Sequence, residues 1–199
     1  MDDTARGLTR GDLVQGALVT AGGAVVGAVA LGGLPDFAAS KPSPQQDAEI
    51  LNFALMMEYV QFGFYAEALS RKVLAGELLE YARIVGGQEE EHVNFVRGAL
   101  GKAAKPKPKL EFGDATSDAD HFAQTALKLE DLGIAAYNAQ APNLTKDALA
   151  AAARIVSVEA RHAAWIRDVT GLNPAPDAVE PTASADKVMK TFQGSGFVR

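Results

Sequence analysis

Apolar residues recur at helical spacing along four segments of the chain, and no segment alternates apolar and polar residues as a half-buried strand would. The four segments comprise residues 47–73, 78–100, 119–140 and 146–170. Gly101 and Gly171 follow the second and fourth segments as predicted C-caps, and Pro142 ends the third. A shorter helix is predicted over residues 185–191, within a tail of residues 172–199 that is otherwise extended. The pattern predicts an all-α protein.

The links between these helices predict how they are arranged. Short links at Gly76 and at Pro142 imply that the first two helices are antiparallel neighbours, as are the last two. The middle link, residues 102–118, is rich in Pro and Lys. At roughly 3.3 Å per residue it could stretch to about 55 Å, whereas a 20-residue helix is about 30 Å long. We therefore expect a four-helix bundle made of two antiparallel helical hairpins joined by a long crossover.

The N-terminus has a different composition from the rest of the chain. Arg6 and Arg10 precede residues 13–35, an apolar stretch that is rich in glycine and carries no charge. This arrangement is typical of an export signal cleaved near residues 37–40, and an uncleaved membrane anchor is the main alternative. An N-terminal helix that is disordered or packs on the domain is a third interpretation. The segment resembles a twin-arginine signal but has Gly11 where the second arginine should be.

Three parts are therefore expected along the chain: an export signal or N-terminal membrane anchor at 1–40, the bundle at 41–171, and the tail at 172–199. The protein is expected to be exported to the periplasm, the cell envelope or the extracellular space, with membrane attachment through an uncleaved N-terminus as the alternative.

Charge and cysteine content exclude several classes of function. The 19 Lys and Arg residues against 25 Asp and Glu give a formal charge of -6, with no basic stripe, so nucleic acid is not an expected partner. The absence of Cys excludes disulfides, zinc ribbons and iron–sulfur clusters. Only three His are present, so their positions are informative.

Two of these His lie three residues after a Glu, at a spacing that places both side chains on one face of a helix. The first and third helices each add a single Glu in an apolar setting. Four carboxylates and two imidazoles are the ligand set of di-iron and di-manganese carboxylate bundles. The predicted metal ligands are Glu58, Glu89, His92, Glu130, Glu159 and His162. A chance coincidence of acids and His is the alternative, but an acidic cluster buried without metal would be costly.

The two hairpins also resemble two copies of one unit. Each single Glu is followed seven residues later by a Tyr, Tyr65 or Tyr137, and each paired motif is followed by Arg97 or Arg167 at the same distance. This internal match predicts a site with pseudo-twofold symmetry. The two tyrosines are interpreted as core residues that hydrogen-bond carboxylates surrounding the ligands, and a redox-active tyrosine is the alternative. The third histidine, His121, is interpreted as a surface or capping residue.

Several stretches carry a family resemblance: ILNFALMMEYVQFGFYAEAL, GGQEEEHVNFVRGALG, LEFG in the crossover, and IVSVEARHAAWIRDVTG. Together they resemble the ferritin-like domain family that includes plant desiccation-related proteins and exported bacterial homologues. The resemblance spans roughly residues 47–171 and implies a ferritin-like fold with a dinuclear metal site. The chain departs from ferritin cages in lacking their fifth helix, and from rubrerythrins in lacking the Cys of a rubredoxin centre.

The leading hypothesis is an exported ferritin-like protein that binds two Fe or two Mn ions and reacts with dioxygen or peroxide, as a ferroxidase or oxidative-stress protein. In this hypothesis Glu58 and Glu130 are terminal ligands, each His caps one ion, and Glu89 and Glu159 bridge the ions. A manganese catalase-like enzyme and a non-catalytic module related to stress or desiccation are the alternatives. A monomer or small homo-oligomer is expected. Sequence does not discriminate iron from manganese, because both accept these ligands.

Overall fold

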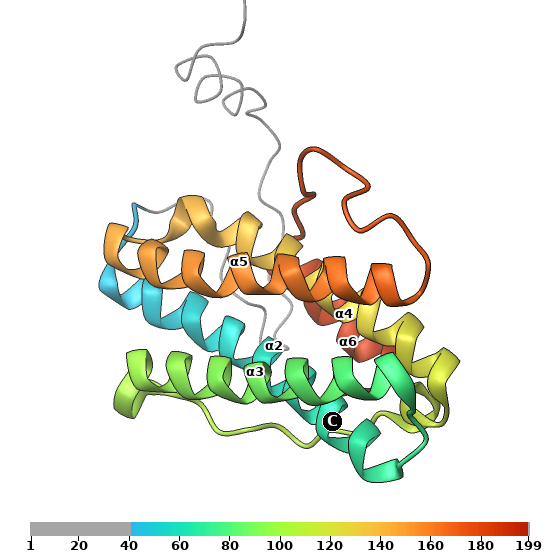
Figure 1. The fold of residues 1–199 in the computed structure, drawn as a ribbon. Coiled ribbons are helices and arrows are strands. Elements are labelled where there is room, and N and C mark those ends of the chain that lie inside the picture. The colour runs from blue at the N-terminus through green and yellow to red at the C-terminus, as the bar shows by residue number, and fades with distance from the viewer. Residues whose placement is uncertain (1–40, 199) are drawn as a thin grey trace, which may run out of the picture. The chain divides into compact units, whose positions relative to one another are not determined.

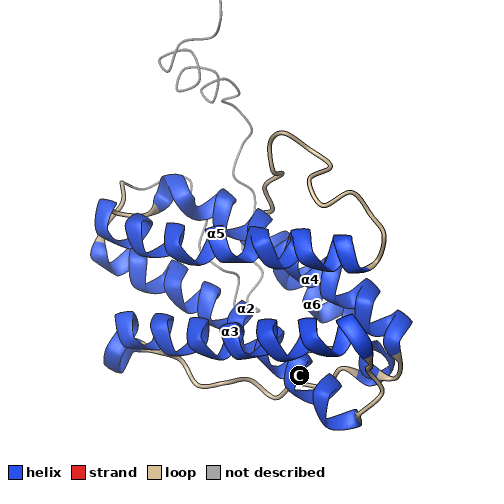
Figure 2. Ribbon diagram, viewed as in Figure 1, coloured by secondary structure: helices blue, strands red, loops and turns tan. Residues whose placement is uncertain are grey.

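The fold is seen in a computed structural model that describes residues 41–198. Within this range the chain forms helices and loops and contains no strand (Figure 2). The α-helices are α2 (Pro44–Arg71), α3 (Gly76–Leu100), α4 (Ala119–Gln140), α5 (Lys146–Val169) and α6 (Ala185–Ser195). The predicted all-α class is confirmed. The predicted export signal or membrane anchor lies outside the described residues.

The four long helices form two antiparallel hairpins, α2 with α3 and α4 with α5 (Figure 1). The crossover leaves the end of α3, runs along the bundle, and reaches the start of α4 through the short 3-10 turn Gly113–Thr116. The predicted bundle of two hairpins joined by a long crossover is therefore observed.

Local capping explains where the helices begin and end. The hydroxyl of Ser43 accepts a hydrogen bond from the N–H of Gln46 and Pro44 takes the first helical position, so α2 begins earlier than the expected Asp47. At its other end Lys72 adopts a left-handed conformation with φ of 58° and terminates the helix. Helix α3 begins at Gly76, two residues before the predicted start.

The crossover is fixed to α2 at two places. Near its start, the side chain of Asn52 donates to the carbonyl of Ala103 at 3.0 Å and accepts from the N–H of Lys105 at 2.8 Å. Further along, Leu110 packs directly over Gly63, where a Cβ would lie only 2.7 Å from its side chain. These contacts hold the long link against the outer face of the first hairpin.

The tail after α5 returns to the bundle. The N–H of Ala183 donates to the carbonyl of Ala135 in α4 at 2.9 Å, and α6 buries Val188 and Phe192. The N–H of Glu111 in the crossover donates to the carbonyl of Phe197 at 3.1 Å. Helix α6 runs to Ser195, beyond the predicted residue 191. None of the helices within residues 41–198 combines the length and apolar character needed to cross a membrane.

Candidate metal centre

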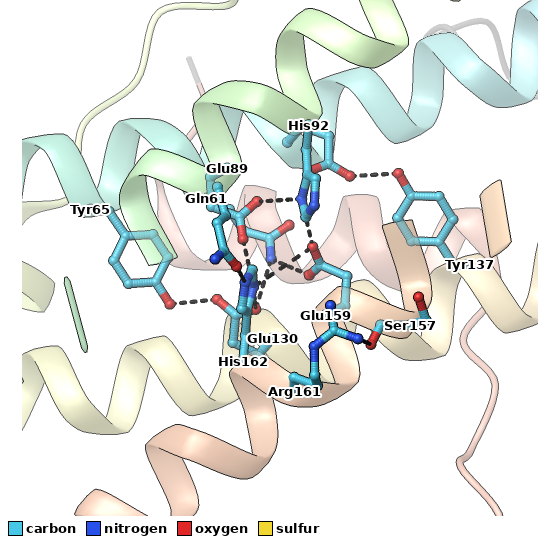
Figure 3. Close-up of polar contacts among 12 residues, drawn as sticks. Gln61, Tyr65, Glu89, His92, Glu130, Tyr137, Ser157, Glu159, Arg161 and His162 are labelled. Carbon is cyan, nitrogen blue, oxygen red and sulfur yellow. Dashed lines mark hydrogen bonds and ion pairs between the residues drawn. The ribbon is translucent and has the colours of Figure 1, made fainter. Parts of the chain in front are cut away.

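All six predicted ligands meet in the middle of the bundle. Helix α2 supplies Glu58, α4 supplies Glu130, and α3 and α5 each supply one Glu and one His from adjacent turns. The four carboxylates are fully buried, His162 is 2% exposed and His92 is 9% exposed. Four helices that are distant in sequence therefore point carboxylate and imidazole groups into one enclosed space (Figure 3).

The ligand atoms divide into two overlapping groups, which we call the first and second positions. The first position comprises Glu58, Glu89, His92 and Glu159, and the second comprises Glu89, Glu130, Glu159 and His162. Within each group the atoms offered by the residues lie within 4.8 Å of one another. The two positions share Glu89 and Glu159, one carboxylate from each hairpin.

The distances show which atoms face each position. In the first position Nδ1 of His92 lies 3.0 Å from Oε1 of Glu159 and 3.4 Å from Oε2 of both Glu58 and Glu89. In the second, Nδ1 of His162 lies 3.0 Å from the other oxygen of Glu89, Oε1. Glu89 therefore turns one oxygen toward each histidine (Figure 3).

The buried atoms of this centre are not satisfied by the protein. Six of them have no hydrogen-bond partner: Oε2 of Glu58, both carboxylate oxygens of Glu89, Oε1 of Glu159, and Nδ1 of His92 and His162. The short His–Glu distances are close approaches without hydrogen-bond geometry, since the atoms converge on shared space. Buried polar atoms normally have partners, and carboxylate and imidazole donors suit first-row divalent metals. The residues present therefore fit a metal centre.

Two tyrosines hold the terminal carboxylates. The hydroxyl of Tyr137 on α4 donates to Oε1 of Glu58 on α2 at 2.5 Å, and Tyr65 on α2 donates to Oε1 of Glu130 on α4. Burial raises the pKa of both phenols well above the usual range of tyrosine, and the charge of the adjacent carboxylate raises it further. Both tyrosines therefore remain protonated hydrogen-bond donors. The tyrosines do hydrogen-bond carboxylates, but the acceptors are two of the predicted ligands themselves rather than carboxylates around them, and the bonds run between the hairpins.

Sequence reasoning missed two glutamines at this centre. Nε2 of Gln61 donates to Oε2 of Glu159 at 2.9 Å and to Oε2 of Glu130 at 3.4 Å. Oε1 of Gln88 lies 2.7 Å from Nε2 of His162. The spacing of three residues after Glu58 places Gln61 on the same face of the first helix, but the sequence gives no sign of which carboxylates it reaches.

Without metal, the centre holds protons. Burial by itself would lower the pKa of His92, but its contacts with the carboxylates outweigh that effect and raise the pKa to about 12. The same balance raises the pKa of His162 to about 10. Burial is the main reason that the pKa values of two carboxyls are raised, and repulsion from the charge of Glu159 is the second. The pKa of Glu130 rises to about 7, and that of Glu89 rises well above its usual range. A metal bound here would have to displace such protons.

The other repeated residues lie away from the centre. Arg97 donates to the hydroxyl of Tyr59 at 3.1 Å, and Arg167 donates to both carboxylate oxygens of Asp131 at 2.7 and 2.8 Å. Tyr59 and Asp131 each follow the single Glu of their hairpin, so the two contacts are equivalent. His121 is exposed near the start of α4, in line with its interpretation as a surface residue. The arginines therefore brace each hairpin rather than contact the ligands.

A four-helix bundle with a long crossover and a buried carboxylate–histidine cluster defines the class of ferritin-like helical proteins. The ferritin-like domain family matches residues 46–172, which is most of the chain, and the protein belongs to this family. A search of curated proteins found no significant match. The suspected family is thereby confirmed, and the cluster is one that could hold metal.

Proposed function

We propose that the protein binds two divalent metal ions, iron or manganese, one at each position of the centre. The observation that carries this proposal is the pair of overlapping ligand groups that share Glu89 and Glu159. Two divalent cations would also balance the charge of the four ionised carboxylates, which an apolar core does not tolerate unpaired. Glu58 and His92 would be terminal ligands of the first ion, and Glu130 and His162 of the second.

We further propose that the loaded centre reacts with dioxygen or hydrogen peroxide. Bound iron or manganese would supply the one-electron chemistry that protein side chains lack. The chain contributes a buried site and carboxylates whose orientation Tyr65 and Tyr137 hold. A pocket of about 10 Å³ is bordered by Met57 and by Tyr137, whose hydroxyl donates to Glu58, and it has room for about one water-sized molecule. A small oxidant is the kind of reactant that a space of this size would admit.

We propose that this chemistry takes place outside the cytoplasm. Support comes from the uncharged apolar residues 13–35 that follow Arg6 and Arg10. Fractionation of the producing cell, with mass spectrometry of the mature N-terminus, tests this proposal. A new N-terminus near residue 40 in an exported fraction would support signal cleavage, and an intact N-terminus in the membrane fraction would support the anchor. Intact protein confined to the cytoplasm would contradict both.

The test of the metal centre is elemental analysis of the full-length protein after anaerobic loading with iron or manganese, with peroxide consumption followed on the same sample. We expect two ions per chain in the wild type, a lower metal content in His92→Ala, and an unchanged content in the control variant His121→Ala. Oxygen release from peroxide by the manganese form would indicate catalase-like turnover. Bound metal without turnover of either oxidant would indicate a non-catalytic role, and no bound metal would refute the centre.

A further inference from the structure

The pseudo-twofold symmetry of the centre is broken at one buried side chain. Glu58 and Tyr65 of the first hairpin correspond to Glu130 and Tyr137 of the second, each pair at the same spacing. Gln61 lies between the first pair, three residues after the Glu, and the residue at the corresponding place between the second pair is a glycine, Gly133. The two halves therefore differ inside the ligand cluster itself.

Because Gly133 has no side chain, the side chains of Gln61 and Glu159 can occupy the space beside it. A Cβ on Gly133 would lie 3.1 Å from Oε2 of Glu159, closer than ordinary van der Waals contact, and 3.4 Å from Nε2 of Gln61. Gln61 itself is 2% exposed. Its carboxamide is therefore enclosed among the carboxylates (Figure 3), and it cannot exchange its partners freely for water.

This arrangement leaves the two positions with different numbers of free ligand atoms. In the first position one atom of each residue lacks a hydrogen-bond partner, at Glu58, Glu89, His92 and Glu159. In the second position Oε1 of Glu89, Nδ1 of His162 and Oε1 of Glu159, which lies 4.0 Å from that nitrogen, are free. Oε2 of Glu130, 3.3 Å from Nδ1 of His162, accepts from Gln61, as does the other oxygen of Glu159.

We infer that Gln61 makes the two metal positions unequal, so that the first position fills first and the second binds its ion more weakly. This inference rests on the proposed function. An ion at the second position competes with the hydrogen bond from Gln61 to the oxygen of Glu130 that faces it, whereas the oxygens that face the first position accept no hydrogen bond from a glutamine. A hydrogen bond to a charged group contributes enough to change an affinity by about tenfold or more.

Gln88 acts in the opposite direction. Its contact with Nε2 of His162 favours the tautomer whose Nδ1 is free to bind metal, and the residue that corresponds to Gln88 in the other hairpin, Val158, has no such group. Gln88 is exposed, however, so water competes for this contact, while the bonds of Gln61 are buried. The contribution of Gln61 therefore sets the order of filling.

The experiment measures anaerobic Mn²⁺ binding to full-length single-histidine variants by calorimetry, with electron paramagnetic resonance as a second readout. The His162→Ala variant keeps the first position intact and should therefore retain the higher-affinity Mn²⁺ binding. His92→Ala leaves the second position and should bind its ion about tenfold more weakly. Equal affinities, or the reverse order, would overturn the inference.

A second comparison isolates Gln61. In the His92→Ala background, Gln61→Leu removes the competing hydrogen bonds at similar volume and should tighten the remaining Mn²⁺ by about tenfold. A lower Mn²⁺ affinity would show that Gln61 instead supports the second position, and an unchanged affinity would show that it plays no part. Either result overturns the inference. Gln124→Leu, an exposed position on α4, is the matched control, and Gln61→Met serves if the Leu variant fails to fold. Absence of Mn²⁺ binding in the wild type would instead refute the proposed function.

Discussion

Two adjacent glycines of α3 provide a sharp test of the packing that supports the centre. Gly86 is buried, and a Cβ there would lie 2.9 Å from Cβ of Tyr65, the residue that holds Glu130. Gly87 is exposed, and a Cβ there would have no neighbour within 4 Å. The same substitution by Ala therefore meets a crowded site at one position and open solvent at the next.

The helix-propensity gain is the same at both positions, about 1 kcal/mol for replacing Gly by Ala within a helix. Gly87→Ala should realise this gain. At Gly86 the contact involves the Cβ of Tyr65 rather than the end of a flexible side chain, so the helices must move apart. Overpacking of this kind costs about 1–3 kcal/mol. The two variants should therefore differ by about 1–3 kcal/mol in the free energy of unfolding, with Gly86→Ala the less stable.

The measurement is thermal and urea unfolding of both variants and the wild type without metal, followed by far-ultraviolet circular dichroism. For a domain of this size 1 kcal/mol corresponds to about 2–4 °C in Tm. Gly87→Ala should melt above the wild type and Gly86→Ala well below Gly87→Ala. If both variants were stabilised equally, the close packing of Tyr65 against α3 would be wrong, and with it the account of how Glu130 is positioned.

Four further outcomes are expected. Tyr137→Phe removes the hydrogen bond to Glu58, a terminal ligand of the first position. The affinity of that position for Mn²⁺ should fall about tenfold in a titration, while the helicity is retained. Asp47→Ala leaves the backbone N–H of Thr145 without its partner and should lower the free energy of unfolding by about 1–3 kcal/mol in urea. The hydrogen bond from the backbone N–H of His121 is the main reason that the pKa of Asp118 is lowered to about 2. The charged Asp118 therefore stabilises α4 above its unfolded pKa of about 3.9, and this stabilisation is lost as pH falls through about 2, where wild type and Asp118→Ala should become equally stable. Mn²⁺ loading at neutral pH should release protons from the two buried imidazoles, whose pKa values are raised to about 10 and about 12, so apparent affinity measured by calorimetry should rise with pH.

The bundle could be predicted from sequence because its determinants are local. Helical periodicity, a glycine such as Gly101 after the second helix, and the lengths of the links define the elements and their order. The spacing of Glu89 and His92, repeated in the fourth helix, then places the ligand side chains on helix faces. None of these features depends on which helix faces meet, so the order of residues along the chain is enough to recognise them.

The role of Gln61 could not be predicted, because it depends on how two helices face each other. In sequence a polar residue within a helical pattern is compatible with a solvated face as well as with a buried contact. Only the packing of α2 against α4 shows that Gln61 lies opposite Gly133 and reaches Glu159 on a third helix. The docking of the tail is also non-local, since the bond from Glu111 to Phe197 joins segments far apart in the chain.

The buried acids couple metal binding to the stability of the fold in this protein. Tyr65, Tyr137 and Gln61 donate to some of the carboxylate oxygens, but unsatisfied oxygens and imidazole nitrogens remain at the centre. A buried charge without a partner is strongly destabilising, so the metal-free centre has to hold protons in place of ions. An apolar cluster that includes Phe64 and Phe122, stacked with ring centroids 5.2 Å apart, packs beside the ligands and does not depend on metal. The metal-free protein should therefore stay helical, and an ion present at about 1,000 times its Kd should add about 4 kcal/mol to the free energy of unfolding.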